Sequence, residues 1–140
     1  GGANTRLAYT CQDANRQGSI CTINPDGTHL QMLAREADGG NGGPRWSPNA
    51  RRIVFESGAA TWIMQSDGTN AHRVSPPLGG GESDVWPNWS PDATKILFAS
   101  TRGTGGQDGN LFTMNADGSG LHQVTHSATS SEESSDWQSV

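Results

Sequence analysis

The chain has 140 residues, of which 31% are hydrophobic and 19 are glycine, and its formal net charge at pH 7 is -5. This length suits one domain, residues 1–140, with a thin core, and the glycine clusters favour short strands joined by loops over helices. The charge, and the lack of any Lys/Arg cluster longer than Arg51 and Arg52, argue against a nucleic-acid or anionic-membrane partner. No apolar run approaches the roughly 20 residues of a membrane span.

Alternating apolar residues predict a series of short strands with no helix between them. In chain order these strands lie near residues 6–11, 19–24, 29–34, 44–47, 52–57, 61–65, 71–75, 86–89, 95–100, 110–115, 121–125 and 135–138.

The predicted strands repeat with a period of about 40 to 50 residues. Each repeat has an Asp-Gly pair, and two of them contain a Trp-Ser-Pro turn. Trp46, Trp89 and Trp137 mark one column of the repeat, and we expect them to pack between neighbouring units. Four short strands with a recurring aromatic residue are typical of β-propeller blades.

The repeated residues also resemble a known family. "PRWSPNA" at 44–50 and "PNWSPDA" at 87–93 are followed by "RIVFES" and "KILFAS", and then by "MQSDGT" and "MNADGS". This pattern, from about Arg6 to Trp137, resembles the WD40-like (PD40) repeat of TolB-like β-propellers. The resemblance implies an all-β fold of four-stranded blades. It implies no single activity, because the family includes periplasmic scaffold proteins, polysaccharide-processing enzymes and the propellers of peptidases.

The predicted strands start partway through one repeat and finish partway through another. When the strands of a blade are lettered A to D from the channel outward, the order is B-C-D, A-B-C-D, A-B-C-D and a last A. Three blades cannot close into a ring, because propellers need 4 to 8 blades. We therefore predict three four-stranded repeats per chain, half of a six-bladed propeller. Two copies would form a homodimer with swapped terminal strands, in which residues 135–138 pair beside Arg6 to Cys11 of the other copy. The alternatives that stay open are a larger or irregular assembly and an excerpt of a longer propeller.

Cys11 and Cys21 end one predicted strand and begin the next. We expect them opposite each other across a hairpin, within reach of a disulfide. In the alternative, Cys21 fills an apolar position that Trp62 and Phe112 occupy in the other repeats. A disulfide would imply an oxidising compartment, and the predicted location is periplasmic or secreted.

The sequence contains no nucleophile elbow, zinc-protease helix or phosphate-binding loop, so we predict no catalytic residue, no enzymatic activity and no cofactor apart from the calcium considered next. The Asp-Gly pairs are interpreted as turns rather than as a calcium repeat. The histidines are interpreted as solvated residues, with zinc as the alternative. They are His29, His72, His122 and His126.

The loops that lead into the tryptophan strands carry polar side chains, which we expect at the mouth of the channel. The candidate residues are Asn41, Arg45, Glu82, Asp84, Glu132, Glu133 and Asp136. They predict a site for a protein, a basic peptide or Ca²⁺, with Asp84 and Glu132 as candidate metal ligands. The alternative is that these acidic loops are only solvated.

The function predicted from the sequence is a non-catalytic binding and assembly module. Two alternatives stay open: a minimal or designed propeller scaffold with no ligand, and half of a propeller-type polysaccharide lyase.

Overall fold

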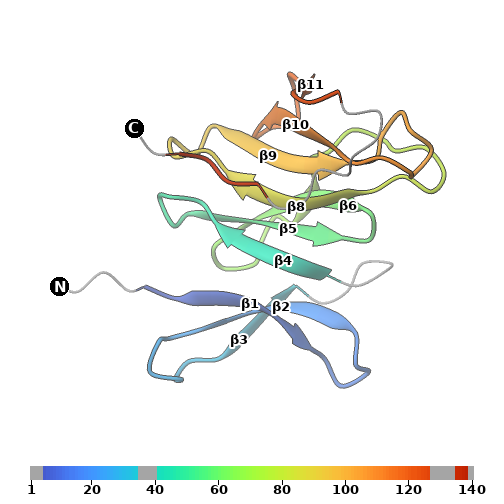
Figure 1. The fold of residues 1–140 in the computed structure, drawn as a ribbon. Helices are drawn as coiled ribbons and strands as arrows, with labels where there is room; N and C mark the ends of the chain where they lie inside the picture. The colour runs from blue at the N-terminus through green and yellow to red at the C-terminus, as the bar shows by residue number, and fades with distance from the viewer. Residues whose placement is uncertain (1–4, 35–40, 127–134, 139–140) are drawn as a thin grey trace.

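A computed structural model describes residues 5–34, 41–126 and 135–138, and every regular element among them is a strand (Figure 1). The strands are β1 (Leu7–Gln12), β2 (Gly18–Ile23), β3 (Gln31–Ala34), β4 (Asn41–Trp46), β5 (Arg52–Ser57), β6 (Ala60–Gln65), β7 (His72–Arg73), β8 (Asp84–Trp89), β9 (Lys95–Ser100), β10 (Asn110–Asn115) and β11 (His122–Gln123). No helix that could cross a membrane occurs in these three stretches. The predicted all-β fold is confirmed.

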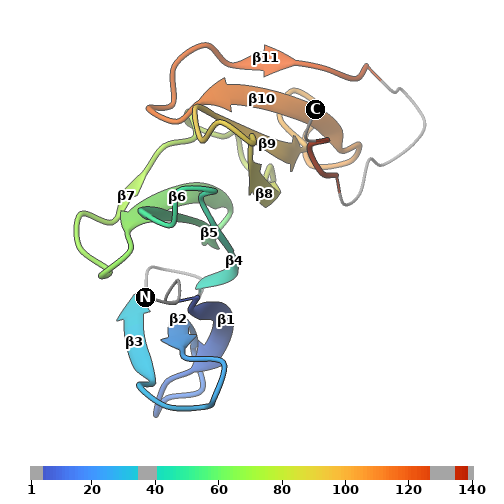
Figure 2. The ribbon, with the colours of Figure 1, turned by 90° about the vertical axis from the view of Figure 1, so that its left-hand side faces the viewer.

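The strands form three antiparallel sheets in the orders β1-β2-β3, β4-β5-β6-β7 and β8-β9-β10-β11. We call them the first, second and third sheets. Figure 2 shows them arranged as a fan, with β1, β4 and β8 on the inner, concave side and β3, β7 and β11 on the outer side. Consecutive sheets therefore stand to each other as propeller blades do, and the first sheet has only the strands lettered B, C and D.

The hairpins form where the repeated residues direct them. In each Asp-Gly turn the aspartate accepts a hydrogen bond from the backbone two residues later, as from Thr28 N to Asp26 Oδ1 at 2.9 Å. The same bond measures 2.9 Å at Asp67 and at Asp117. These carboxylates serve their own turns, which is the role predicted from the sequence.

The Ser-Pro turns between the two inner strands are built alike in the second and third sheets. Ser47 Oγ donates to Asn49 Oδ1 at 2.8 Å, and Ser90 Oγ donates to Asp92 Oδ1 at 2.6 Å. The residue that ends the turn has a positive φ in both sheets, 56° at Ala50 and 59° at Ala93. Because alanine rarely adopts this conformation, the side-chain hydrogen bonds must hold the turn in place.

The core lies between the sheets. One buried cluster joins the second sheet to the third, and its larger members are Val54, Ile63, Val74, Trp89, Ile96, Phe98, Phe112 and Met114. A second cluster joins the first sheet to the second, with Ile20, Ile53, Phe55 and Met64 buried and Leu33, Trp46 and Trp62 half-buried around them. Each sheet thus buries its faces only where it has a neighbour.

Three expectations differ from the structure. The outer strands predicted at 71–75 and 121–125 shorten to two residues each, because two successive backbone nitrogens beyond β7 donate to the one carbonyl of Thr61, and two beyond β11 donate to that of Leu111, which ends the regular pairing. Residues 135–138 form no strand in this single chain, since the expected neighbour, β1, belongs to the far sheet of the fan. Trp137 is half-buried there.

Cys11 and Cys21 form a disulfide, with their Cα atoms 5.8 Å apart. They are not directly opposite each other as expected, because the register pairs Cys11 with Ser19 and Cys21 with Tyr9. The disulfide joins a diagonal pair of the hairpin, which strand twist brings together.

The turn at Asp92 predicts a specific loss of stability in acid. Hydrogen bonds from Ser90 and Thr94 lower the pKa of Asp92 from 3.8 to about 2. Because the folded pKa lies below the unfolded one, this contribution is complete above about pH 4 and disappears as the pH falls toward 2. We expect Asp92→Asn to fold normally at pH 7, since Asn49 already accepts the same bond from Ser47 in the second sheet.

The measurement is the urea midpoint between pH 5 and pH 2. The midpoint of Asp92→Asn should fall less over this range than that of the unmodified chain. Equal pH dependence of the two proteins would contradict the role assigned to the carboxylate.

Candidate functional site

The inner strand β8 holds an exposed tryptophan in an unfavourable backbone conformation. Trp86 has a φ of 53° and is 46% exposed, and it precedes Pro87. A positive φ is costly for a bulky residue, and a following proline disfavours it further. The corresponding position of β4 is Gly43, with a φ of 55°. Both lie where the pairing of the inner strand is interrupted, between Gly42 and Arg45 and between Val85 and Asn88.

A contact from the second sheet holds this conformation. Glu56 Oε1 accepts a hydrogen bond of 2.6 Å from the backbone nitrogen of Trp86. A strained residue persists only where its surroundings fix it, and such residues cluster at functional sites. Sequence reasoning overlooked Trp86, although the signal was present: a tryptophan stands directly before proline in a column where the repeat has glycine.

Trp86 lines a hollow of 470 Å³ on the concave side, together with Arg45 of β4 and Asp136 of the last segment. Asn88 Nδ2 donates to Asp136 Oδ1 at 2.5 Å and ties that segment to β8. Two residues predicted at the channel mouth, Arg45 and Asp136, are therefore brought together beside an exposed indole. An aromatic face beside a guanidinium suits a peptide ligand.

Asp84 has a different role from the one predicted. It is fully buried, and both carboxylate oxygens accept hydrogen bonds from Arg102 Nη2, at 2.9 and 2.8 Å. The Arg102 Cζ atom lies 5.8 Å from the Phe98 ring centroid and 5.6 Å from that of Phe112. Since the carboxylate is engaged by this cation, Asp84 is no open metal ligand.

Two further candidates, Asn41 and Glu82, do not line the hollow beside Trp86. Asn41 is buried, 6% exposed, at the start of β4. Glu82 accepts hydrogen bonds from the backbone nitrogens of Gly79 and Gly103, both at 2.7 Å, which lower its pKa. Glu132 and Glu133 lie outside the described residues. The calcium site thus stays a prediction, and in the part of the chain that is described no three His, Cys, Asp or Glu side chains come together as metal ligands.

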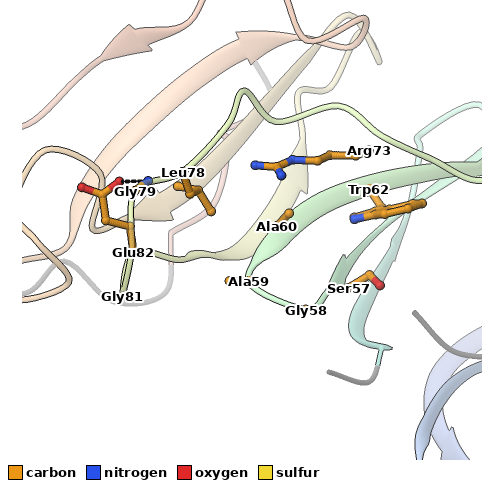
Figure 3. Close-up of a pocket in the computed structure, with 10 residues that line it drawn as sticks. All are labelled: Ser57, Gly58, Ala59, Ala60, Trp62, Arg73, Leu78, Gly79, Gly81 and Glu82. Carbon is orange, nitrogen blue, oxygen red and sulfur yellow. Dashed lines mark hydrogen bonds between the residues drawn. The ribbon is translucent and has the colours of Figure 1, made fainter. Parts of the chain in front are cut away.

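A second hollow, of 660 Å³, lies between the β5–β6 turn and the loop from β7 to β8 (Figure 3). Trp62 and Arg73 lie on one side and Glu82 on the other. The guanidinium of Arg73 already donates to Ser75 O at 2.9 Å and to Pro76 O at 2.7 Å. The Arg73 guanidinium therefore already holds the loop from β7 to β8. The hollow beside Trp86 is the better candidate for a ligand.

We call the contact between two consecutive sheets a seam. The tryptophans at the ends of the inner strands β4 and β8 lie at two seams, and within the described stretches only the one at the seam between the second and third sheets has a hydrogen-bond partner for its indole N–H. Trp89 Nε1 donates to the carbonyl of Arg45 in the preceding sheet at 3.2 Å. Trp46 occupies the same column of the second sheet, but its Nε1 is buried and has no hydrogen-bond partner among the described residues. The first sheet, which precedes it, has no strand A to supply the carbonyl.

The outer part of the seam shows the same contrast. A Cβ atom added to Gly68 would lie 2.9 Å from Leu33 O, and one added to Gly118 would overlap Val74 O, so each Asp-Gly turn packs on the outer strand of the preceding sheet. For Gly27, in the first sheet, no atom of the described residues lies within 4 Å of that position. Val124, the counterpart of Leu33 and Val74, is 48% exposed.

The fan of three sheets around a concave inner face defines a partial β-propeller. Among solved structures, the chain is similar to an Agrobacterium tumefaciens protein assigned as TolB, with 23% identity, a TM-score of 0.71, and 84% of this chain and 44% of that one covered. It is also similar to TolB from Acinetobacter baumannii, with 18% identity, a TM-score of 0.67, and coverage of 86% and 30%.

An oligogalacturonate lyase in complex with manganese is similar at 20% identity, with a TM-score of 0.58 and coverage of 77% and 30%. The chain spans less than half the length of these structures. No protein-family model and no curated protein matches the sequence. The predicted resemblance to TolB-like propellers is thus confirmed at the level of the fold, and the activities of these proteins remain their own.

The buried ion pair predicts a large effect of one substitution and its partial rescue by a second. Arg102→Met leaves the Asp84 carboxylate buried without a cation, which should lower the free energy of unfolding by about 3–5 kcal/mol. Adding Asp84→Asn should return about 1–3 kcal/mol, because an amide is less costly to bury than an unpaired carboxylate. Asn41 already occupies this column in the second sheet.

Urea unfolding at one fixed protein concentration measures both effects. A double variant no more stable than Arg102→Met would show that the carboxylate is not the source of the loss.

Proposed function

We propose that the protein is a non-catalytic β-propeller module that assembles with a second copy into a six-bladed ring and binds a protein or peptide at its channel face. The observation that carries the proposal is the indole N–H of Trp46, which is buried without an acceptor, whereas its counterpart Trp89 donates to Arg45 O at 3.2 Å. A buried donor without a partner costs about 1–3 kcal/mol, so an incoming strand that offers a carbonyl there is favoured.

The chain itself contains a segment that fits this need. Arg45, Asn88 and Asp136 each stand directly before the tryptophan of their repeat. Asp136 of a second copy would therefore face Trp46 as Arg45 faces Trp89. The same arrangement would pair residues 135–138 of the second copy with the free edge of β1, which pairs with β2 alone among the described strands.

The outer part of the seam supports the same arrangement. Val124 of one copy and the turn at Gly27 of the other are the counterparts of Val74 and Gly118, which pack together inside the chain. Two copies, each with three blades, give a number within the 4 to 8 that propellers use. The two seams are equivalent by two-fold symmetry, so the assembly closes and cannot extend into a fibre.

The channel face supplies the binding site of the module. Trp86 presents an exposed indole, and the side chain of Arg45 makes no hydrogen bond or ion pair within the described residues. An apolar ring beside a free guanidinium is suited to a peptide that places an apolar side chain and a carboxylate side by side.

The Cys11–Cys21 disulfide supports a periplasmic or secreted location, because disulfides persist in oxidising compartments.

The ring predicts the effect of two neighbouring substitutions on association. Val124→Asp would place a charge in the proposed seam, so it should raise the dissociation constant of the dimer by at least about tenfold. Leu121→Asp is the matched control, because its counterpart Ala71 stays exposed although the seam between the second and third sheets is formed.

Sedimentation equilibrium of the intact chain and of both variants makes the measurement. The intact chain and Leu121→Asp should be dimers, and the thermal midpoint of the intact chain should rise with protein concentration. An intact chain that sediments as a folded monomer would overturn the ring, as would a Val124→Asp variant that dimerises as tightly as the control.

The channel site predicts the effect of a second substitution. Trp86→Gly removes the indole while relieving backbone strain, since Gly43 holds the same column. It should preserve or raise stability and weaken binding of a selected peptide by at least about tenfold. The peptide is selected from a library on the intact protein, with glycans and Ca²⁺ as parallel arms.

Peptide binding that Trp86→Gly leaves unchanged would move the site elsewhere. A screen in which no peptide binds would favour the bare scaffold. Cleavage of oligogalacturonate in the glycan arm would replace the non-catalytic assignment by a lyase.

A further inference from the structure

A hollow of 580 Å³ opens at the seam between the first and second sheets, at the end where the Ser-Pro turns lie. The residues of its wall used below are Arg6, Gln31, Trp46, Ala50 and Asp67. All five come from one chain, and the proposed ring would in addition bring Asp136 of a second copy to the Trp46 indole N–H.

The next seam has the same construction, and there the corresponding space is filled. The counterparts of Trp46 and Ala50 are Trp89 and Ala93. The Cζ atom of Arg52 lies 4.6 Å from the centroid of the Trp89 ring, and its Nη2 donates to Ala93 O at 3.0 Å. A guanidinium thus stacks on the indole and reaches the carbonyl at the end of the Ser-Pro turn.

Arg6 is the counterpart of Arg52, but it is bound elsewhere. Its Nη1 donates to Gln31 Oε1, and its Nη2 donates to His29 O at 2.6 Å and to Thr22 O at 3.4 Å. These bonds direct the guanidinium along the outer strands of the first sheet. The second sheet consequently presents a half-buried tryptophan without its cation.

We propose that this hollow is a binding site for a guanidinium group, as carried by an arginine side chain of a partner peptide or by a small alkylguanidine. The ligand would stack on Trp46 as Arg52 stacks on Trp89. Ala50 has the same left-handed conformation as Ala93, 56° against 59°, so its carbonyl is placed to accept the second contact.

Two charged side chains line the hollow, and they are the Arg6 guanidinium, which is bound to the first sheet, and the Asp67 carboxylate. The Asp67 carboxylate lines the hollow and uses its Oδ1 atom for Thr69, at 2.9 Å from the backbone nitrogen and 2.6 Å from the hydroxyl. The other oxygen remains to pair with a cation. The net charge of -5 adds a general attraction for a positively charged ligand.

The test is an NMR titration of the intact chain with butylguanidinium and with butylurea, which has a similar shape but no charge. The reporter is the indole N–H resonance of Trp46, identified by its loss in Trp46→Phe. We expect a saturable shift, with a dissociation constant about five- to tenfold lower for butylguanidinium than for butylurea.

Two arginine variants locate the site. Arg52→Ala empties the matching space at the next seam, so the Trp89 resonance should now respond as well. Arg6→Ala should leave binding at Trp46 within about twofold of the intact chain, since the Arg6 guanidinium is bound to Gln31 and His29 and does not stack on Trp46.

Three results would overturn the proposal. The first is no saturable response of Trp46 in the intact chain. The second is binding that appears only in Arg6→Ala, which would show that Arg6 itself fills the hollow in solution. The third is equal affinity for butylurea, which would make the hollow an apolar cavity without cation selectivity.

Discussion

The packing of each sheet against its neighbour is the interaction on which the structure depends. A sheet of three or four short strands has no core of its own, and the buried residues lie in clusters that join consecutive sheets. At the inner end of one seam, Trp89 closes the contact through its indole N–H and the stacked Arg52. The seam is therefore the unit of stability, and an uncovered sheet face is its main liability.

The same requirement explains why the ends of the fan matter for function. Inside the chain, Val74 is covered by the turn at Gly118, while the equivalent Val124 is exposed and the turn at Gly27 touches nothing at that position. Trp46 repeats the contrast with its unpaired N–H. The structure thus offers two surfaces that each match a surface already packed within it, which is the basis of the proposed ring.

The differences between repeats point to the sites. Because the three sheets share one backbone arrangement, a residue that differs from those at the same position of the other sheets can be compared with them directly. Trp86 replaces a glycine and accepts backbone strain, Arg102 caps an aromatic pair that has no such cap in the second sheet, and Arg6 leaves its tryptophan unstacked. Each departure either costs stability or creates a specific contact, and Trp86 and Arg6 mark the two proposed binding sites.

The sequence by itself determined the strands, the turns and the period. These features depend on neighbours within a few residues, so they can be predicted without knowledge of the fold. Examples are the alternation of apolar residues in the strands and the local hydrogen bonds of Asp26, Asp67 and Asp117. Only the tertiary structure decided which polar residues meet. Asp84 looked like an open ligand, but Arg102, on the next strand's loop, pairs with it. Arg45 and Asp136, which were grouped from the sequence, line one hollow. Their neighbour Trp86 went unnoticed, because the strain and exposure that distinguish it arise only when β8 is placed against β5 and Glu56.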